Sequence, residues 1–275
     1  MRADIFATLR STAPREGKVA IDVARDGYVA TVTIDRPEAL NAFDAPHLEA
    51  LLALLRTLRD DRSVRCAIVT GAGDRAFSAG ADIKRMATFG PREGRAFAAL
   101  GHAVTKAIET LPQPVIAAVN GYAFGGGCEL ALACDIRICS ENAAFAQPEV
   151  TLGIPPGWGG TQRMPRVVGP GIAAEIIFTG RRVGAAEALR IGLVNAVYPA
   201  DRLPHEAQAL AARIAANSPR AVRAAKAAMS RAFSGEPAAG LNSELDLFGA
   251  AFATDDQTIG MEAFIAKQVA EFADE

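Results

Sequence analysis

The chain has few of the side chains from which metal and redox sites are built. Among its 275 residues there are three histidines, far apart in sequence, and four cysteines, none of them in a C-x-x-C pair. A zinc site is therefore not expected. Because all four cysteines lie in apolar segments, we expect reduced thiols buried in the core. The net charge of −2 is also too small to gather nucleic acid, so nucleic-acid binding is not expected.

Long hydrophobic runs are missing as well. Half of the residues are hydrophobic, but no run reaches the roughly 20 residues that a membrane helix requires, so no membrane association is expected. Residues 1–18 mix basic and acidic side chains and lack the apolar segment of a signal peptide. We interpret them as a loosely ordered tail of a cytoplasmic protein.

Strand and helix patterns alternate in the first half of the chain, whereas the second half is almost entirely helical. Strands are predicted at residues 19–23, 28–34, 67–69, 115–119 and 136–139, and helices at 46–58, 91–110 and 128–134. Seven further helices are predicted at 159–168, 171–179, 184–190, 203–216, 218–233, 237–252 and 255–272. The alternation favours an α/β core at residues 19–200, followed by a helical C-terminal region at 201–275.

A glycine triplet, Gly125–Gly127, stands between a predicted strand and a predicted helix. Glycines at such a point leave backbone N–H groups exposed, and the positive end of the helix lies beneath them. The pattern favours a site for an anion or a developing oxyanion, although a tight strand-to-helix turn would also use these glycines. Glu129 falls in the first helical turn beside this site, where it either takes part in chemistry or only stabilises the start of the helix.

Two further segments could complete such a site. Phe77–Lys84 again leads from a strand through a glycine-containing loop into a predicted helix, so it could supply a second N–H donor, or Asp82 could simply cap the helix. Glu149 follows a proline and precedes an apolar stretch. A carboxylate in apolar surroundings is harder to ionise, as groups that transfer protons often are. Its alternative role is to compensate the dipole of a short helix.

In the order in which they occur, these segments resemble the crotonase (enoyl-CoA hydratase/isomerase) superfamily. The motifs are G-A-D from Gly80, N-G-x-x-x-G-G-G-x-E-L from Asn120, Q-P-E from Gln147 and L-G-x-x-P-G-x-G-G-T-Q-R from Leu152. The resemblance covers roughly residues 19–273. It implies an α/β, crotonase-like spiral of repeated β-β-α units, with a helical C-terminal trimerisation region and assembly as a homo-trimer or homo-hexamer.

The resemblance also implies roles for individual residues. Glu129 and Glu149 match the two catalytic glutamates of the hydratases, and the backbone N–H groups of Ala81 and Gly126 match the oxyanion hole. Contacts with the acyl-CoA substrate are implied for Gly80, Asp82, Ile83, Lys84, Gly125, Gly157, Phe264 and Lys267. Lys84 would meet the phosphates of coenzyme A, while Phe264 and Lys267 would reach the coenzyme A of a neighbouring subunit.

Because both glutamates are present, we expect hydration of a trans-2-enoyl-CoA to a 3-hydroxyacyl-CoA, a reaction of fatty acid metabolism. Glu129 would orient and deprotonate the water, and Glu149 would deliver a proton to Cα. Coenzyme A is then part of the substrate, and no metal or other cofactor is expected. The alternative is another acyl-CoA reaction on the same oxyanion hole, above all the shift of a 3-enoyl to a 2-enoyl double bond by Glu149 alone. Met86 and Phe89 would narrow the acyl pocket.

Three other classes of protein fit less well. Gly71–Ala76 matches the dinucleotide fingerprint G-x-G-x-x-A, but Phe77–Gly80 interrupts the segment where the helix should begin. Ser78 lies in a segment close to G-x-S-x-G that lacks its first glycine, and the histidines occupy unconvincing contexts for a serine hydrolase. A non-enzymatic acyl-CoA or RNA-binding role is disfavoured because the chain has no run of Lys and Arg.

Overall fold

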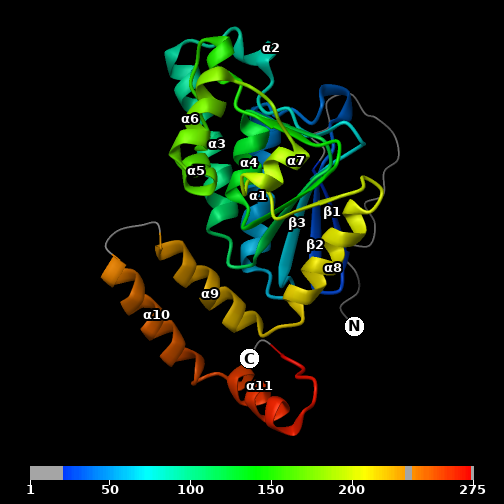
Figure 1. Ribbon diagram of the computed structural model, residues 1–275, viewed down its shortest axis with the longest axis vertical. Helices are drawn as coiled ribbons and strands as arrows, with labels where there is room; N and C mark the ends of the chain where they lie inside the picture. The colour runs from blue at the N-terminus through cyan, green and yellow to red at the C-terminus, as the bar shows by residue number, and fades with distance from the viewer. Residues whose placement is uncertain (1–20, 233–236, 274–275) are drawn as a thin grey trace.

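Two β-sheets of unequal size organise the chain in the computed structural model, which describes residues 21–232 and 237–273. The predicted tail at residues 1–18 lies outside the described residues. The larger sheet consists of β1 (Ile21–Asp26), β2 (Val29–Ile34), β3 (Cys66–Gly71), β5 (Val115–Val119), β7 (Ile136–Ser140) and β10 (Ala196–Tyr198), in that order. Only the β1–β2 hairpin is antiparallel, so the centre of this sheet is parallel (Figure 1).

The smaller sheet is made of very short strands. It consists of β4 (Ala76–Ser78), β6 (Tyr122–Phe124), β8 (Ala144–Ala146) and β9 (Val183–Gly184), in that order. The first three strands are parallel, whereas β9 pairs antiparallel with β8. None of these strands was predicted from the sequence, because three residues are too few to show an alternating pattern.

The two sheets are built by a repeated unit. Each of β3, β5 and β7 is followed by a short strand of the smaller sheet and then by helical structure. The helical parts are α2 (Ile83–Met86) with α3 (Pro91–Glu109), α4 (Gly126–Ala133), and the 3₁₀ helix η2 (Glu149–Leu152) with α5 (Gly160–Val168). The predicted α/β architecture of repeated β-β-α units is confirmed.

Helices cover both faces of the larger sheet. The residues of β5 are all buried, which explains their continuous apolar sequence, since strands in a parallel sheet contact helices on both faces. One face packs against α1 (Ala45–Asp60) and α3, and the other against α8 (Leu203–Ala215). The side chain of Asp44 caps α1 by accepting a hydrogen bond from the N–H of His47. All four cysteines are free and buried, as predicted.

The last three helices extend away from this core. They are α9 (Pro219–Arg231), α10 (Pro237–Ala251) and α11 (Asp255–Ala266), and they form the lower part of the molecule in Figure 1. The final helix ends before the predicted residue 272, because Lys267 adopts the left-handed conformation (φ 56°) of a helix C-terminus. Because α8 packs on the sheet, the core continues past residue 200. No helix in the described ranges is long and apolar enough to span a membrane.

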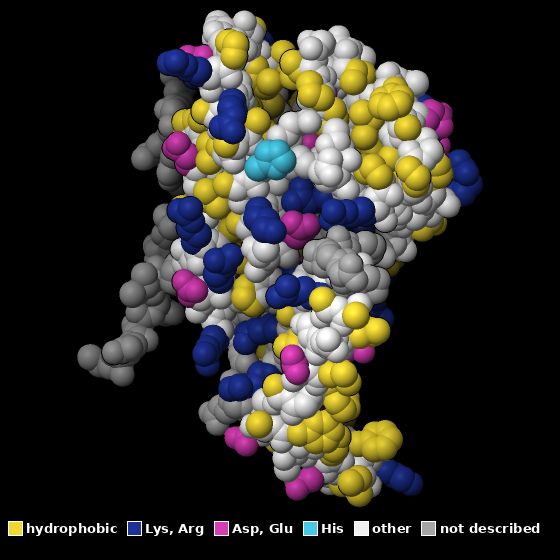
Figure 2. Space-filling view, turned by 90° about the vertical axis from the view of Figure 1, so that its left-hand side faces the viewer, with side chains coloured by type: hydrophobic (Ala, Val, Ile, Leu, Met, Phe, Trp, Pro, Cys, Tyr) yellow, Lys and Arg dark blue, Asp and Glu magenta, His cyan; other side chains and the backbone are white. Residues whose placement is uncertain are grey.

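One face of α10 carries large exposed hydrophobic side chains. They recur at helical spacing and are Leu241, Leu245 and Phe248, followed by Phe252 directly after the helix, each at least 52% exposed. Hydrophobic side chains gather over this lower part of the molecule in Figure 2. Contiguous apolar faces of this kind are rare on monomeric globular proteins.

Candidate active site

Three segments that are distant in sequence meet at one edge of the smaller sheet. Because β4, β6 and β8 are neighbouring parallel strands, their carboxyl ends lie at the same edge. The residues that follow are Gly80–Asp82 after β4, Gly125–Glu129 after β6 and Gln147–Glu149 after β8. Ligands of parallel α/β sheets bind outside the carboxyl ends of the strands. The smaller sheet therefore gathers the predicted motifs at one candidate site.

The first two segments touch at their glycines. Gly80 has a φ of +87°, and a Cβ atom built on it would lie 2.8 Å from the backbone nitrogen of Gly126. Phe43 donates its N–H to the carbonyl oxygen of Gly80 and accepts one from Asp82, so the N–H of Ala81 points away from Phe43. Only glycine permits this approach of the two loops.

The backbone N–H groups of Ala81 and Gly126 are free for a ligand. Neither donates to an acceptor among the described residues. Gly126 is the first residue of α4, where backbone N–H groups have no acceptor within the helix. The close approach of Gly80 to Gly126 brings these two donors near each other, next to the positive end of α4.

Glu129 is held in the interior by the segment between η2 and α5. Its side chain is 1% exposed, and its Oε1 accepts hydrogen bonds of 2.7 Å from the N–H groups of both Trp158 and Gly160. Burial raises the pKa of Glu129, against the opposing effect of these hydrogen bonds and of the Arg163 guanidinium. The carboxyl group therefore has a fixed orientation, and its environment disfavours the ionised form.

Glu149 is the second buried carboxyl group. It is the first residue of η2, and a Cβ atom built on Gly125, which has a φ of +51°, would lie only 2.8 Å from its Oε1. Burial and then the charge of Glu129 raise the pKa of Glu149 to about 7. The two carboxyl groups thus interact, and one of them changes its charge near neutral pH.

Gln147 supports the Glu149 carboxyl group. Its side chain is fully buried, and with its amide nitrogen turned toward Glu149 it donates to both carboxyl oxygens, at 3.3 and 3.2 Å. The sequence motifs contained Gln147, Trp158 and Gly160, but no supporting role was predicted for any of them. The Q-P-E motif was the available signal for Gln147, whereas backbone donors such as those of Trp158 and Gly160 leave no signal of their own in a single sequence.

The other predicted residues after β4 occupy the start of α2. The Asp82 carboxylate caps this helix by accepting the N–H of Lys84, and it pairs with Arg36 at 3.1 Å. Ile83 and Lys84 are exposed. Lys84 is therefore accessible to an anionic group, while the Asp82 side chain already has a structural role.

The remaining predicted residues lie in two different places. Gly157 immediately precedes Trp158, and a Cβ atom built on it would approach Ala98 of α3 no closer than 3.9 Å. Phe264 lies in α11 and Lys267 directly follows this helix. Both are at the opposite end of the molecule from α2 (Figure 1). Within one chain they do not lie near Glu129 and Glu149. Their contact with the substrate of a neighbouring subunit stays a prediction.

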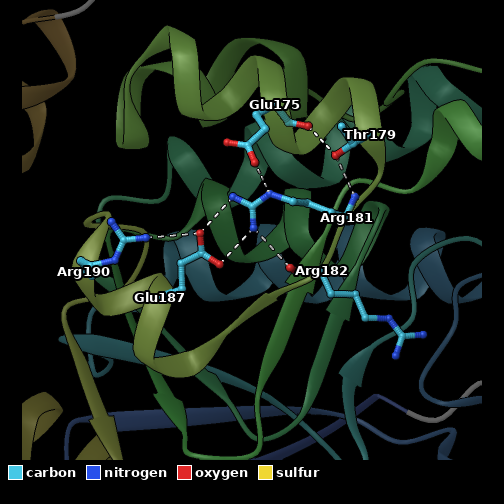
Figure 3. A network of polar contacts seen from close by, with 6 residues as sticks. All are labelled: Glu175, Thr179, Arg181, Arg182, Glu187 and Arg190. Carbon is cyan, nitrogen blue, oxygen red and sulfur yellow. Dashed lines mark hydrogen bonds and ion pairs between the residues drawn. The ribbon is translucent and has the colours of Figure 1, made fainter.

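An ion-pair network lies next to the segment that carries Glu149. Arg181 pairs with Glu175 at 2.8 Å and binds both carboxyl oxygens of Glu187, at 2.9 and 3.0 Å (Figure 3). The preceding Gly180 packs closely on this segment, since a Cβ atom built on it would lie 3.3 Å from Cα of Pro148. The network therefore joins α6 (Pro170–Thr179) to α7 (Ala185–Arg190) and fixes the turn between them, whose Gly180 contacts the segment that carries Glu149.

Arg181→Ala is expected to destabilise the protein modestly. Because the side chain is 29% exposed, we expect a loss of roughly 0.5–1 kcal/mol, smaller at high salt, measured by denaturant unfolding. Arg190→Ala is the matched control, because Arg190 contacts Glu187 only at 3.5 Å and is 72% exposed. An equal effect of both substitutions would show that the bidentate pair contributes nothing particular.

Comparison with known proteins identifies relatives that are named enoyl-CoA hydratases. The family model "Enoyl-CoA hydratase/isomerase" matches residues 24–275. The chain is 48% identical over 244 residues to a short-chain-enoyl-CoA hydratase of Clostridium acetobutylicum, covering 89% of this chain and 94% of that protein. It is 46% identical over 252 residues to a crotonyl-CoA hydratase of Syntrophomonas wolfei, covering 92% and 97%. The crystal structure of an enoyl-CoA hydratase from Bacillus anthracis matches with a TM-score of 0.91 at 40% identity, covering 93% and 99%.

Proposed function

Because the chain belongs to the enoyl-CoA hydratase/isomerase family, we propose that it adds water reversibly to trans-2-enoyl-CoA thioesters to form 3-hydroxyacyl-CoA. The observation that carries this proposal is the pairing of two buried, interacting carboxyl groups beside two free backbone N–H groups. Such an arrangement suits a reaction in which a proton leaves one atom of the substrate complex and another proton arrives nearby.

In the proposed mechanism, the N–H groups of Ala81 and Gly126 bind the thioester oxygen as it gains negative charge. Donors that are fixed in place stabilise such charge without reorganisation. Glu129 takes a proton from water as the oxygen attacks Cβ, and Glu149 gives its proton to Cα. One proton is therefore shared by the two carboxyl groups both before and after the addition. Coenzyme A is part of the substrate in this scheme.

The direct test is a panel of trans-2-enoyl-CoA thioesters of increasing acyl length. Hydration removes the double bond that is conjugated with the thioester, so turnover appears as a loss of absorbance of that conjugated system. We expect saturable turnover with at least the shorter thioesters. No turnover with any thioester of the panel would overturn the proposed function.

The activity is expected to fall as the pH rises above about 7. The active form carries one proton on the pair of glutamates, and this proton is lost as the pH passes the raised pKa of Glu149, about 7. Above that pH, kcat/KM should fall about tenfold per pH unit. Because hydration neither consumes nor releases a proton overall, kcat/KM for hydration and dehydration should fall in parallel. Profiles that stay level through pH 9, or that diverge, would contradict the shared proton.

A second reaction on the same site is the isomerisation of 3-enoyl-CoA to 2-enoyl-CoA. The observation that favours it is the pKa of Glu149, about 7, because one group can then both accept and donate a proton at neutral pH. An assay with a 3-enoyl-CoA, following the appearance of the conjugated thioester, measures this activity. Retention of isomerisation in Glu129→Gln would assign it to Glu149 alone.

We also propose that the chain assembles into a homo-trimer or a homo-hexamer. Support comes from the exposed apolar face of α10 and from Phe264, Ile265 and Val269 at the end of the chain, each at least 79% exposed. Sedimentation equilibrium of the full chain measures the assembly. Leu245→Glu should lower the mass toward that of a monomer, since a buried unpaired charge is strongly unfavourable. A monomeric wild-type protein would overturn the proposal.

A further inference from the structure

Trp158 is the largest side chain next to the two glutamates. It is 4% exposed, and its backbone N–H binds Glu129 at 2.7 Å. The indole ring therefore has a fixed position relative to the carboxyl group that the mechanism places beside Cβ of the substrate.

The ring occupies a space that two glycines leave open. A Cβ atom on either Gly126 or Gly101 would overlap the indole ring. Gly101 lies inside α3, where glycine costs about 1 kcal/mol relative to alanine. The close contact with Trp158 accounts for this unfavourable choice. The ring is thereby inserted between α3 and the start of α4, the helix that presents the oxyanion donor.

Other aromatic rings hold the indole in this position. Its centroid lies 5.7 Å from that of Phe97 and 6.1 Å from that of Phe43, both in edge-to-face geometry. Phe97 in turn contacts Phe89 at 5.6 Å. Such contacts restrict the ring, so it cannot easily move aside for a ligand.

The position of the ring limits the space for the substrate. With the thioester oxygen on the N–H of Gly126 and Cβ beside Glu129, the acyl chain starts at two residues that Trp158 contacts, Gly126 through its ring and Glu129 through its backbone N–H. We propose that Trp158 determines specificity by closing the acyl pocket, so that the enzyme prefers short 2-enoyl groups such as crotonyl. This inference rests on the proposed function. Met86 and Phe89, which were predicted to narrow the pocket, are partly buried against the same core.

The test compares kcat/KM for trans-2-decenoyl-CoA and crotonyl-CoA in the wild type, Trp158→Phe and Trp158→Leu. Each substitution retains the backbone N–H that binds Glu129. The wild type should prefer crotonyl-CoA, and the ratio of decenoyl to crotonyl activity should rise in Trp158→Leu by at least ~10-fold, since each methylene accommodated in an apolar pocket is worth about that factor. Trp158→Phe should lie between.

Leu58→Ala serves as the control for general loosening of the core. Leu58 is 2% exposed and lies in the last turn of α1. Phe43, which contacts the indole ring, precedes the first turn of the same helix. This variant should lose stability, about 2–5 kcal/mol, without a change in the ratio. An unchanged ratio in both Trp158 variants, or a wild type that hydrates the two substrates equally well, would overturn the role of Trp158. Absence of hydration of either substrate by the wild type would instead overturn the proposed function.

Discussion

Glu149→Gln is expected to lower kcat for hydration of crotonyl-CoA by about 10²–10⁴-fold while the affinity for coenzyme A is retained. Glutamine has the same shape as glutamic acid but has no proton to deliver to Cα. It can also fill the site beside Gly125, where Gln147 can still donate to the oxygen that remains. Single-turnover and steady-state absorbance assays measure the loss, and equilibrium binding of coenzyme A serves as the control. Near-normal turnover would reject the role assigned to Glu149.

The same substitution should raise the stability of the protein at alkaline pH, although it lowers the activity. Because the folded-state pKa of Glu149 is raised from 4.5 to about 7, the wild type loses stability as the pH rises through this range. At pH 8 the loss amounts to at most roughly 3 kcal/mol. Glu149→Gln removes this ionisation, so the variant should unfold at a higher temperature than the wild type at pH 8 but not at pH 4. A variant that is destabilised at pH 8 would show that the wild-type carboxylate is better accommodated than its burial indicates.

Glu129→Gln is expected to lower kcat for hydration by a similar factor, about 10²–10⁴. The amide oxygen can still accept the N–H groups of Trp158 and Gly160, so the segment before α5 should keep its structure. What is lost is the base that takes the proton from water. The measurement is the same absorbance assay, with thermal unfolding as the control for folding. Near-normal turnover would reject the role of Glu129.

Exchange of the Cα protons of butyryl-CoA in D₂O separates the two roles. This saturated thioester needs only the oxyanion hole and the group that exchanges protons with Cα. Glu129→Gln should therefore retain exchange, whereas Glu149→Gln should lose it. Because the charge of Glu129 contributes to the raised pKa of Glu149, that pKa should be lower in Glu129→Gln. Loss of exchange in both variants alike would contradict the division of roles.

The sequence predicted the long elements and the reactive residues better than their surroundings. The continuous apolar run at residues 115–119 predicted a buried strand and the amphipathic periodicity of residues 91–110 predicted a helix, and they became β5 and α3 with bounds within one residue. Glu129 and Glu149 were selected because motifs and glycine patterns mark them. Their pairing could not be derived from the residues alone, since it depends on which segments become neighbours.

The smaller sheet could not be predicted from the sequence. Its strands β4, β6 and β8 are three residues long and lie in glycine-containing segments, so neither length nor alternation identifies them. Yet their parallel pairing is what brings the three motifs to one edge. The roles of Trp158 and Gly160 toward Glu129 were equally hidden, because a backbone N–H group is present in almost every residue and acquires a particular function only through the fold.

The backbone and side-chain groups of the candidate site differ in how easily a substitution removes them. The two N–H groups at Ala81 and Gly126 belong to the main chain, so among the twenty amino acids only proline at either position removes the donor itself. Each carboxyl group, in contrast, disappears with a single codon change. In the proposed mechanism, the donors that polarise the thioester therefore survive almost every substitution, whereas the carboxyl groups that decide the fate of the polarised acyl group do not.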